Sequence, residues 1–155
     1  MRSVIRVLLT GMSGTGKSTI TRDLVTRGYP AIDADDGWTL PQPDGTLRWD
    51  EIAITHLLDT DGADVLFFAG CEENMVAFLP RFDIVVLLSA PRDVIVQRIA
   101  ERTGNDFGKD PAELARILAD LDEIEPRLRA IADHEVDTTN SIDQVVTSVL
   151  ALVEA

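Results

Sequence analysis

The chain has 155 residues, 45% of them hydrophobic, with a formal net charge of -13 and a single cysteine. This length favours one domain over residues 1–155 with one core. The charge argues against a nucleic-acid binder that works by phosphate neutralisation, although a small anionic ligand can still bind at a local positive site. Cys71 cannot form an internal disulfide, and no apolar run approaches the length of a membrane span. We therefore expect a cytoplasmic protein without nucleic-acid or membrane partners.

Apolar, β-rich runs alternate with helical patterns along the chain. The strands predicted at 4–10 and 84–90 are apolar throughout, which is typical of strands covered on both faces. The pattern predicts a three-layer α/β fold: a five-stranded parallel sheet with helices on both faces and a small lid. The expected strands are 4–10, 30–33, 65–70, 84–90 and 134–137; the expected helices are 17–27, 49–58, 72–79, 93–102, one from Pro111 and one capped by Ser141; residues 34–48 are expected to form a loop.

The segment "GMSGTGKST", residues 11–19, follows the first strand and opens the first helix. It matches the P-loop pattern, in which glycines let backbone N–H groups point into one concavity and the helix N-terminus attracts phosphate. A glycine-rich turn with a surface lysine is the alternative. The nucleotide-binding residues predicted here are Gly11, Gly14, Thr15, Gly16, Lys17, Ser18 and Thr19, with Lys17 at the terminal phosphates and Ser18 as a Mg²⁺ ligand.

Two aspartates alternate at the end of the second predicted strand, in "AIDADDGW". Ligands of parallel sheets bind beyond the carboxyl ends of the strands, so Asp33 and Asp35 can face one point. We expect Asp33 to hold the water shell of Mg²⁺ and Asp35 to orient or deprotonate an acceptor hydroxyl. A solvated acidic turn is the alternative, and Asp36 is expected to cap a helix or to be solvated. Two interpretations of Trp49 stay equally open: it lines an acceptor pocket, or it packs in the core.

Basic residues are scarce, so their grouping is informative. Arg98 and Arg102 share a helix face and precede a flexible segment at 102–110 that ends near Lys109. Closing such a lid would bring both guanidinium groups to the transferring phosphoryl group. A solvated helix face is the alternative, and for Arg127 and Arg129 the two interpretations are evenly balanced.

Other polar residues give weaker signals. Cys71 is expected to be an inert, partly buried thiol. Glu73 and Asn74 lie at a strand end and could touch an acceptor. His56 and His134 lack metal-ligand spacing. The segment "DTTNS" (137–141) could form a turn that brackets a nucleotide base.

These pieces together resemble the small P-loop kinases of the shikimate kinase, gluconate kinase and adenylate kinase-like group. The segments that carry the resemblance are "GMSGTGKST", "AIDADD", "IVVLLSAP", "RIAERTGNDFGK" and "VDTTNSIDQVV", which span residues 4–150. The resemblance implies that Asp33 and Asp35 serve Mg²⁺ and the acceptor hydroxyl, that Arg98 and Arg102 are lid arginines, and that Thr139 to Ser141 contact adenine. The chain is also similar to short proteins described as AAA-family ATPases with an "RTxNxxGK" lid.

The chain departs from the kinase patterns in the acceptor region, expected at 34–58. Only Gly70 stands where shikimate kinases have a glycine triplet, and only Arg48 could replace their acceptor-binding arginine. A nucleoside monophosphate would need several arginines here, and only Arg48 and Arg81 are present.

The function expected from these features is transfer of the γ-phosphoryl group of ATP, with Mg²⁺, to a hydroxyl of a small-molecule acceptor. The alternatives are a nucleotide-dependent switch or regulatory ATPase, and a nucleoside or nucleoside monophosphate kinase. The absence of an acidic residue directly at the end of the third strand weighs against the switch. The acceptor stays open, as does the choice between monomer and homodimer.

Overall fold

A computed structural model of the chain describes residues 4–154, so residues 1–3 and 155 of the expected 1–155 domain lie outside the described part. Five parallel strands form one sheet, as the sequence predicts, and the structure gives their order as β2-β5-β1-β6-β7. The strands of this sheet are β1 (Ile5–Thr10), β2 (Ala31–Asp33), β5 (Val65–Ala69), β6 (Ile84–Ser89) and β7 (His134–Asp137). The helices are α1 (Lys17–Thr26), α2 (Glu51–Leu58), η1 (Glu73–Arg81), α3 (Arg92–Glu101), α4 (Pro111–Ile131) and α5 (Ile142–Glu154).

The central strands supply side chains to two cores, one on each face of the sheet. In β5, Phe67 joins the core beneath α1 and α5, while its neighbour Phe68 joins the core beneath the other helices. Both rings are fully buried. Successive strand residues point to opposite faces, so a strand covered on both sides must be apolar at every position. The three-layer fold predicted from the uniformly apolar runs is confirmed.

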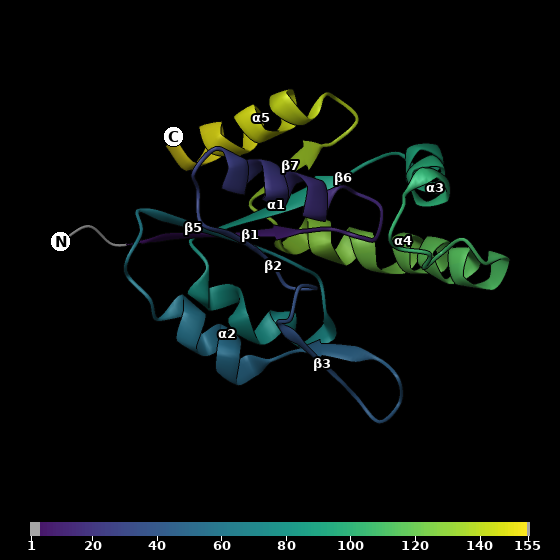
Figure 1. Cartoon of the computed structure of the whole chain (residues 1–155), viewed down its shortest axis with the longest axis horizontal. Helices are drawn as coiled ribbons and strands as arrows, with labels where there is room; N and C mark the ends of the chain where they lie inside the picture. The colour runs from purple at the N-terminus through teal and green to yellow at the C-terminus, as the bar shows by residue number, and fades with distance from the viewer. Residues whose placement is uncertain (1–3, 155) are drawn as a thin grey trace.

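Figure 1 shows α1 and α5 together on one side of the sheet and α2 on the opposite side. The α1–α5 layer packs through apolar positions spaced by three and four residues, including Ile20, Leu24, Val145 and Val149. This arrangement leaves the carboxyl ends of β1, β2 and β5 at one edge of the sheet, where the polar loops follow.

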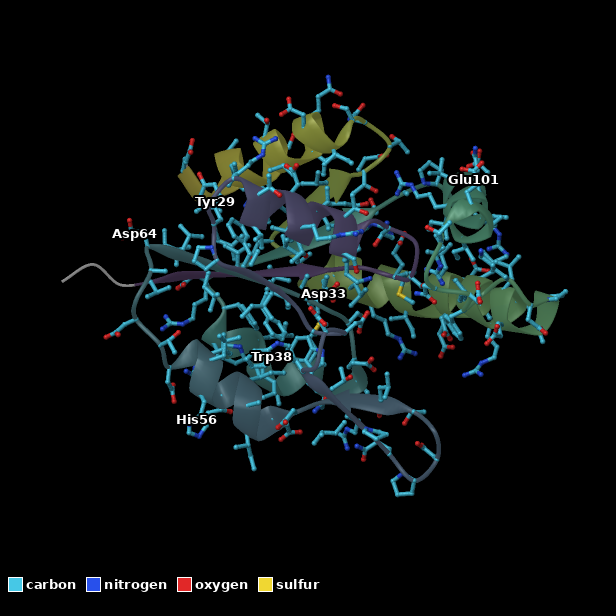
Figure 2. The ribbon with its side chains drawn as sticks, in the orientation of Figure 1. Tyr29, Asp33, Trp38, His56, Asp64 and Glu101 are labelled. Carbon is cyan, nitrogen blue, oxygen red and sulfur yellow. The ribbon has the colours of Figure 1, made fainter. Side chains whose placement is uncertain are left out.

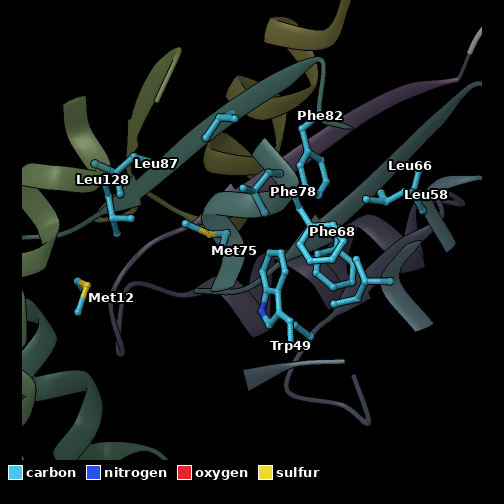
Figure 3. Close-up of a cluster of buried hydrophobic side chains, with 14 of the residues drawn as sticks. Met12, Trp49, Leu58, Leu66, Phe68, Met75, Phe78, Phe82, Leu87 and Leu128 are labelled. Atoms are coloured by element: carbon cyan, nitrogen blue, oxygen red, sulfur yellow. The ribbon is translucent and has the colours of Figure 1, made fainter. Parts of the chain in front are cut away.

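Trp49 is a core residue, which decides the alternative that the sequence left open. Its side chain is 2% exposed and makes an edge-to-face contact with Phe68, with 5.0 Å between ring centroids. Phe78 packs on the same indole, with 5.9 Å between the ring centroids. Figure 3 shows this aromatic cluster beside Met75 and Phe82. The indole therefore anchors the segment before α2 to the sheet and does not line an acceptor pocket.

The prediction of a loop over residues 34–48 is wrong in part, because this segment contains an antiparallel hairpin. Strands β3 (Thr39–Pro41) and β4 (Leu47–Trp49) pair with each other, and the turn between them contains Pro43, Asp44 and Gly45. The Asp44 carboxylate accepts hydrogen bonds from Thr46, and Gly45 has a φ of +85°. Pro-Asp-Gly is a turn sequence that joins two strands. The helix expected from residue 49 consequently begins at Glu51, with Asp50 as its N-cap.

Residues 73–81 form a 3₁₀ helix, η1, somewhat longer than the helix predicted over 72–79. Pro80 lies inside it. A helix of this type makes i to i+3 hydrogen bonds.

Candidate functional site

The loop that joins β1 to α1 has the shape of a phosphate-binding loop. Gly14 and Gly16 have φ angles of +85° and +99°, in the left-handed region that favours glycine. A Cβ atom on Gly11 would lie 2.4 Å from the carbonyl oxygen of Leu88, so only glycine fits where the loop packs on β6. The buried Thr15 hydroxyl donates to the Met12 carbonyl at 2.8 Å. The loop is therefore fixed by its own contacts.

Lys17, the first residue of α1, folds back over this loop. Its Nζ donates to the carbonyl oxygens of Gly11 and Met12 at 2.5 and 2.9 Å. Burial lowers the pKa of Lys17, and the negative charges of Asp35, Asp33 and other nearby acidic groups oppose that shift. The ammonium group is thus held at the helix N-terminus among carboxylates. Thr19, the last residue of the predicted loop motif, lies in the first turn of α1.

Ser18 and Asp33 meet although they are 15 residues apart in the chain. The Ser18 hydroxyl donates to Oδ2 of Asp33 at 2.5 Å. Asp33 is the last residue of β2 and pairs with Ala69 of β5, which fixes it at the carboxyl edge of the sheet. Figure 2 shows Asp33 beside the beginning of α1. A hydroxyl and a carboxylate so close together provide the hard oxygen ligands that Mg²⁺ prefers, so the residues present fit the predicted ion.

Asp35 lies on the turn that follows β2. Its backbone N–H donates to Oδ1 of Asp33 at 3.0 Å. The surrounding protein raises the pKa of Asp35 by desolvating the carboxylate, and the charge of Asp33 raises it further, whereas Lys17 acts in the opposite direction. A carboxylate with a raised pKa is a better proton acceptor than a free aspartate.

Glu72 is a candidate that sequence reasoning missed. It lies three residues beyond Ala69, the last residue of β5, and is half-buried. Its pKa is raised to about 7, first by desolvation and then by the charge of Asp35, while Lys17 opposes the shift. The charge of Glu72 is therefore coupled to those of Asp35 and Lys17, two of the predicted residues. Its position two residues past Gly70, close to the carboxyl end of β5, is the signal that could have found it. Glu73, which the sequence suggested instead, is exposed.

A cavity of about 400 Å³ opens beside these groups, between α1 and the turn after β2. Ser18, Asp33 and Asp35 line it, and Arg22 of α1 adds a positive charge to its wall. A cavity of this size is large enough for a small metabolite. The remaining lining residues are Thr21, Val25, Ala31 and Asp36.

Arg98 lies close to the phosphate loop but is already engaged with protein groups. Its Nη1 donates to Oγ1 of Thr138 at 2.9 Å and to the Gly14 carbonyl at 3.3 Å, and its Nη2 donates to the Thr138 carbonyl at 2.5 Å. Thr139, the predicted base-contacting residue, bonds through its N–H and hydroxyl to Asp137, which lowers the pKa of that carboxyl. Thr138 is the buried member of this turn, and the sequence analysis did not single it out.

Residues 102–110 connect α3 to α4 without regular structure, as expected for the predicted lid. Gly104 and Gly108 have positive φ angles. Arg102 donates to the Phe107 carbonyl within this segment, and its buried Nε has no partner among the described residues. Desolvation lowers the pKa of Arg102. The guanidinium is thus bonded within the lid segment itself.

Several other candidates are structural. The Asn74 amide bonds to the backbone N–H and carbonyl of Trp49 at 2.9 and 3.0 Å, so it positions the hairpin and is not free for an acceptor. Arg127 pairs with Glu123, and Arg129 pairs with Glu125 and Glu135, on the surface. For both arginines the solvated alternative is the correct one.

Cys71 is partly buried, and burial raises the pKa of its thiol, as expected for an inert cysteine. Residues 4–154 contain no group of three or more His, Cys, Asp or Glu side chains arranged to hold a metal ion. Figure 2 shows His56 on α2, well away from Asp33. Within the same residues, no helix is both long and apolar enough to cross a membrane.

Solved structures with the same fold include small-molecule kinases. Shikimate kinase from Acinetobacter baumannii, solved in complex with shikimate, is 22% identical and has a TM-score of 0.68 over 98% of this chain and 94% of its own. A gluconokinase from Sinorhizobium meliloti is 20% identical, with a TM-score of 0.62 over 97% of this chain and 92% of its own. At these identities the likeness shows the fold.

Curated proteins with similar sequences fall into two groups. A protein of Archaeoglobus fulgidus named "Putative adenylate kinase" is 26% identical over 95% of this chain and 81% of its own length. A "Nucleotide-binding protein" of Clostridium perfringens is 30% identical over 86% of this chain, which spans 47% of that relative's length.

The family profile described as "AAA domain" matches residues 7–119, which include the phosphate loop, the Asp33–Asp35 turn and the lid segment. This match covers more than half of the chain, and the sheet order and phosphate loop agree with it. The chain belongs to the AAA domain family and has the fold of the small P-loop kinases.

Proposed function

We propose that this protein transfers the γ-phosphoryl group of ATP to a hydroxyl group of a small-molecule acceptor. The observation that carries the proposal is the meeting of Ser18, Asp33 and Asp35 beside the P-loop, in the lining of the 400 Å³ cavity. In a parallel α/β sheet this edge is where ligands bind. The likeness to shikimate kinase and gluconokinase structures supports the same reaction class.

The nucleotide phosphates would lie against the N–H groups of residues 11–19, which the left-handed glycines and the N-terminus of α1 direct into the loop. Lys17 would exchange its bonds to Gly11 and Met12 for bonds to the β- and γ-phosphates. Ser18 and Asp33 would hold Mg²⁺, which neutralises charge on the phosphates when it is bound. Thr139 would lie next to the base.

The acceptor would enter the cavity with one hydroxyl directed at Asp35. The hydroxyl oxygen attacks the γ-phosphorus while its proton passes to the Asp35 carboxylate, the bond to the β–γ bridging oxygen breaks, and ADP leaves. Closure of the lid at 102–110 would bring the positive charge of Arg102 toward the transferring group. Arg98 is already bound to protein carbonyls, so charge neutralisation in this proposal falls to Lys17 and Arg102.

The test measures ADP release from Mg-ATP with and without a panel of sugars, hydroxylated metabolites, nucleosides and nucleoside monophosphates. Lys17→Ala is the blank, and the exposed Arg116→Ala on α4 is the matched control that removes a cation elsewhere. We expect one acceptor class to raise the rate by a hundredfold or more, equivalent to roughly 3 kcal/mol of barrier. Activity that survives in Lys17→Ala would reject the proposal.

A regulatory ATPase is the second candidate, because an acidic residue, Glu72, follows the end of β5 and its charge is coupled to that of Lys17. In the sequence, the lack of an acidic residue directly at this strand end weighs against such a function. Relatives named only "Nucleotide-binding protein" are consistent with it. A slow, Lys17-dependent basal rate that no acceptor changes would favour this candidate over the kinase.

A further inference from the structure

The turn after β7 is bonded to three segments that are distant in sequence. The Thr138 side chain is buried, and its backbone N–H donates to the Ser89 carbonyl at the end of β6 at 2.8 Å. Its hydroxyl donates to the carbonyl of Thr15 at 2.7 Å, with the Ser89 carbonyl also near at 3.2 Å. The same hydroxyl accepts from Arg98 Nη1. Thr138 therefore uses both its donor and its acceptor capacity to join the phosphate loop to α3 and β6.

Arg98 completes this connection from the other side. Its guanidinium bonds both to Thr138 and to the Gly14 carbonyl, so two successive carbonyls of the phosphate loop are held by the Arg98–Thr138 pair. Among the described residues, none of the ion pairs of the structure involves Arg98. Its positive charge thus lies directly behind the loop and is not cancelled by a bonded carboxylate.

Holding these carbonyls determines where the loop N–H groups point. A trans peptide is planar, so its carbonyl oxygen and its N–H face opposite ways. The carbonyl of Thr15 and the N–H of Gly16 belong to one peptide group. Fixing the oxygen against Thr138 therefore directs the Gly16 N–H away from the pair and toward the concave side of the loop, where a phosphate is expected.

We infer that Arg98 and Thr138 are positioning residues that act through the Gly14 and Thr15 carbonyls to keep the phosphate loop formed before a nucleotide arrives. This inference rests on nucleotide binding by the P-loop, which the proposed function shares. Arg98 then acts indirectly, without contacting the transferring phosphoryl group. Thr138, and not the neighbouring Thr139 suggested by the sequence, is the residue of this turn that acts on the loop.

The variants test separately the Thr138 hydroxyl, the planar geometry of the Arg98 guanidinium and the positive charge of Arg98. Thr138→Val removes the hydroxyl and keeps the shape, Thr138→Ser keeps the hydroxyl, Arg98→Lys keeps the charge without the planar fork, and Arg98→Gln removes the charge. Thr147→Val on the exposed face of α5 and Arg116→Lys on α4 are matched controls. Calorimetric titration with Mg-ADP gives the affinity, and hydrogen exchange of the Gly16 amide in the free protein reports the state of the loop.

We expect Thr138→Val and Arg98→Lys each to weaken Mg-ADP binding about tenfold and to speed Gly16 amide exchange, in line with the loss of one or two ordinary hydrogen bonds. Thr138→Ser should match the parent protein. The double variant Thr138→Val/Arg98→Lys should bind Mg-ADP about as weakly as the weaker-binding of the two single variants, because both changes break the same connection.

Three results would overturn the inference: parental affinity and exchange in Thr138→Val, effects that multiply in the double variant, or a loss of thermal stability without any change at the Gly16 amide. If the parent protein binds no Mg-ADP, the proposed function fails. The exchange measurement in the free protein still decides whether Arg98 and Thr138 hold the loop.

Discussion

Replacing Gly16 with alanine tests whether the phosphate loop needs a left-handed residue for folding, for nucleotide binding or for both. The chain offers a matched position at Gly28, just after α1. The φ angles of the two glycines are +99° and +93°. A Cβ atom at Gly28 would have no neighbour within 4 Å, and at Gly16 the nearest atoms would lie 3.9 Å away. The two substitutions therefore impose the same backbone strain without a steric clash.

The expected loss of stability follows from the backbone alone. A left-handed conformation costs an alanine roughly 1–2 kcal/mol. The lower entropy of alanine in the unfolded chain offsets about 0.4–1 kcal/mol of this. The net loss of about 1 kcal/mol lowers Tm by about 2–4 °C for a chain of this size. Both variants should show this shift in thermal denaturation.

Nucleotide affinity should separate the two variants. Gly16 precedes α1, whose first N–H groups have no partner within the helix and point toward the phosphate site. Relief of the strain turns one of these N–H groups away, and a hydrogen bond to a charged group contributes about 1.5–3 kcal/mol. Mg-ADP should bind Gly16→Ala roughly 10- to 100-fold more weakly than the parent protein in calorimetric titration, whereas Gly28→Ala should bind normally.

Two results would refute this reasoning. Equal affinities in the two variants would show that the loop conformation does not set phosphate binding. A much larger loss of stability in Gly16→Ala than in Gly28→Ala would show that contacts other than backbone strain hold the loop.

Three further substitutions test other parts of the site. Asp35→Asn should lower kcat with the identified acceptor about a hundredfold or more, as expected for a lost proton acceptor, while the KM for Mg-ATP stays the same; a change in that KM alone would contradict the role. The pKa of Glu72 is raised from 4.5 to about 7, so the folded protein holds a proton there that the unfolded chain releases, and stability falls as pH rises from about 4.5 through 7. Glu72→Gln should therefore raise Tm at pH 8 more than at pH 5, whereas Glu73→Gln serves as the control and should shift both equally; a pH-independent effect of Glu72→Gln would refute the assignment. Gly70→Ala would place a Cβ 2.7 Å from the Ala34 side chain, and such overpacking costs about 1–3 kcal/mol in denaturant unfolding; an unchanged midpoint would show that the two strand ends separate easily.

Much of the site could be predicted because its residues belong to local motifs. Gly14, Gly16 and Lys17 lie within four residues of one motif, so the sequence alone placed them together. Asp33 could be assigned to the same edge because it ends a strand of a parallel sheet. The hairpin before α2 was missed because the same residues, Pro43, Asp44 and Gly45, favour any turn, and the pairing of Leu47 to Trp49 with Thr39 to Pro41 is a tertiary outcome.

Arg98 and Thr138 show where local reasoning ends. On a helical projection Arg98 and Arg102 share a face, and this suggested that both reach the phosphate. In the folded protein Arg98 meets a turn 40 residues away, and Arg102 bonds to a carbonyl of its own lid. Hydrogen-bond partners that lie far apart in sequence depend on the packing of α3 against the end of β7, and no spacing rule contains that information.

The sequence by itself determined the sheet, its two covering layers and the position of the phosphate loop. It did so because apolar periodicity and glycine placement act over a few residues and specify local structure directly. Only the tertiary structure decided that Trp49 is core, that Asn74 is a hairpin anchor, that partial burial raises the pKa of Glu72, and that Arg98 binds Thr138. These outcomes depend on which surfaces meet when strands from distant parts of the chain lie side by side, because burial and charge act through space rather than along the sequence.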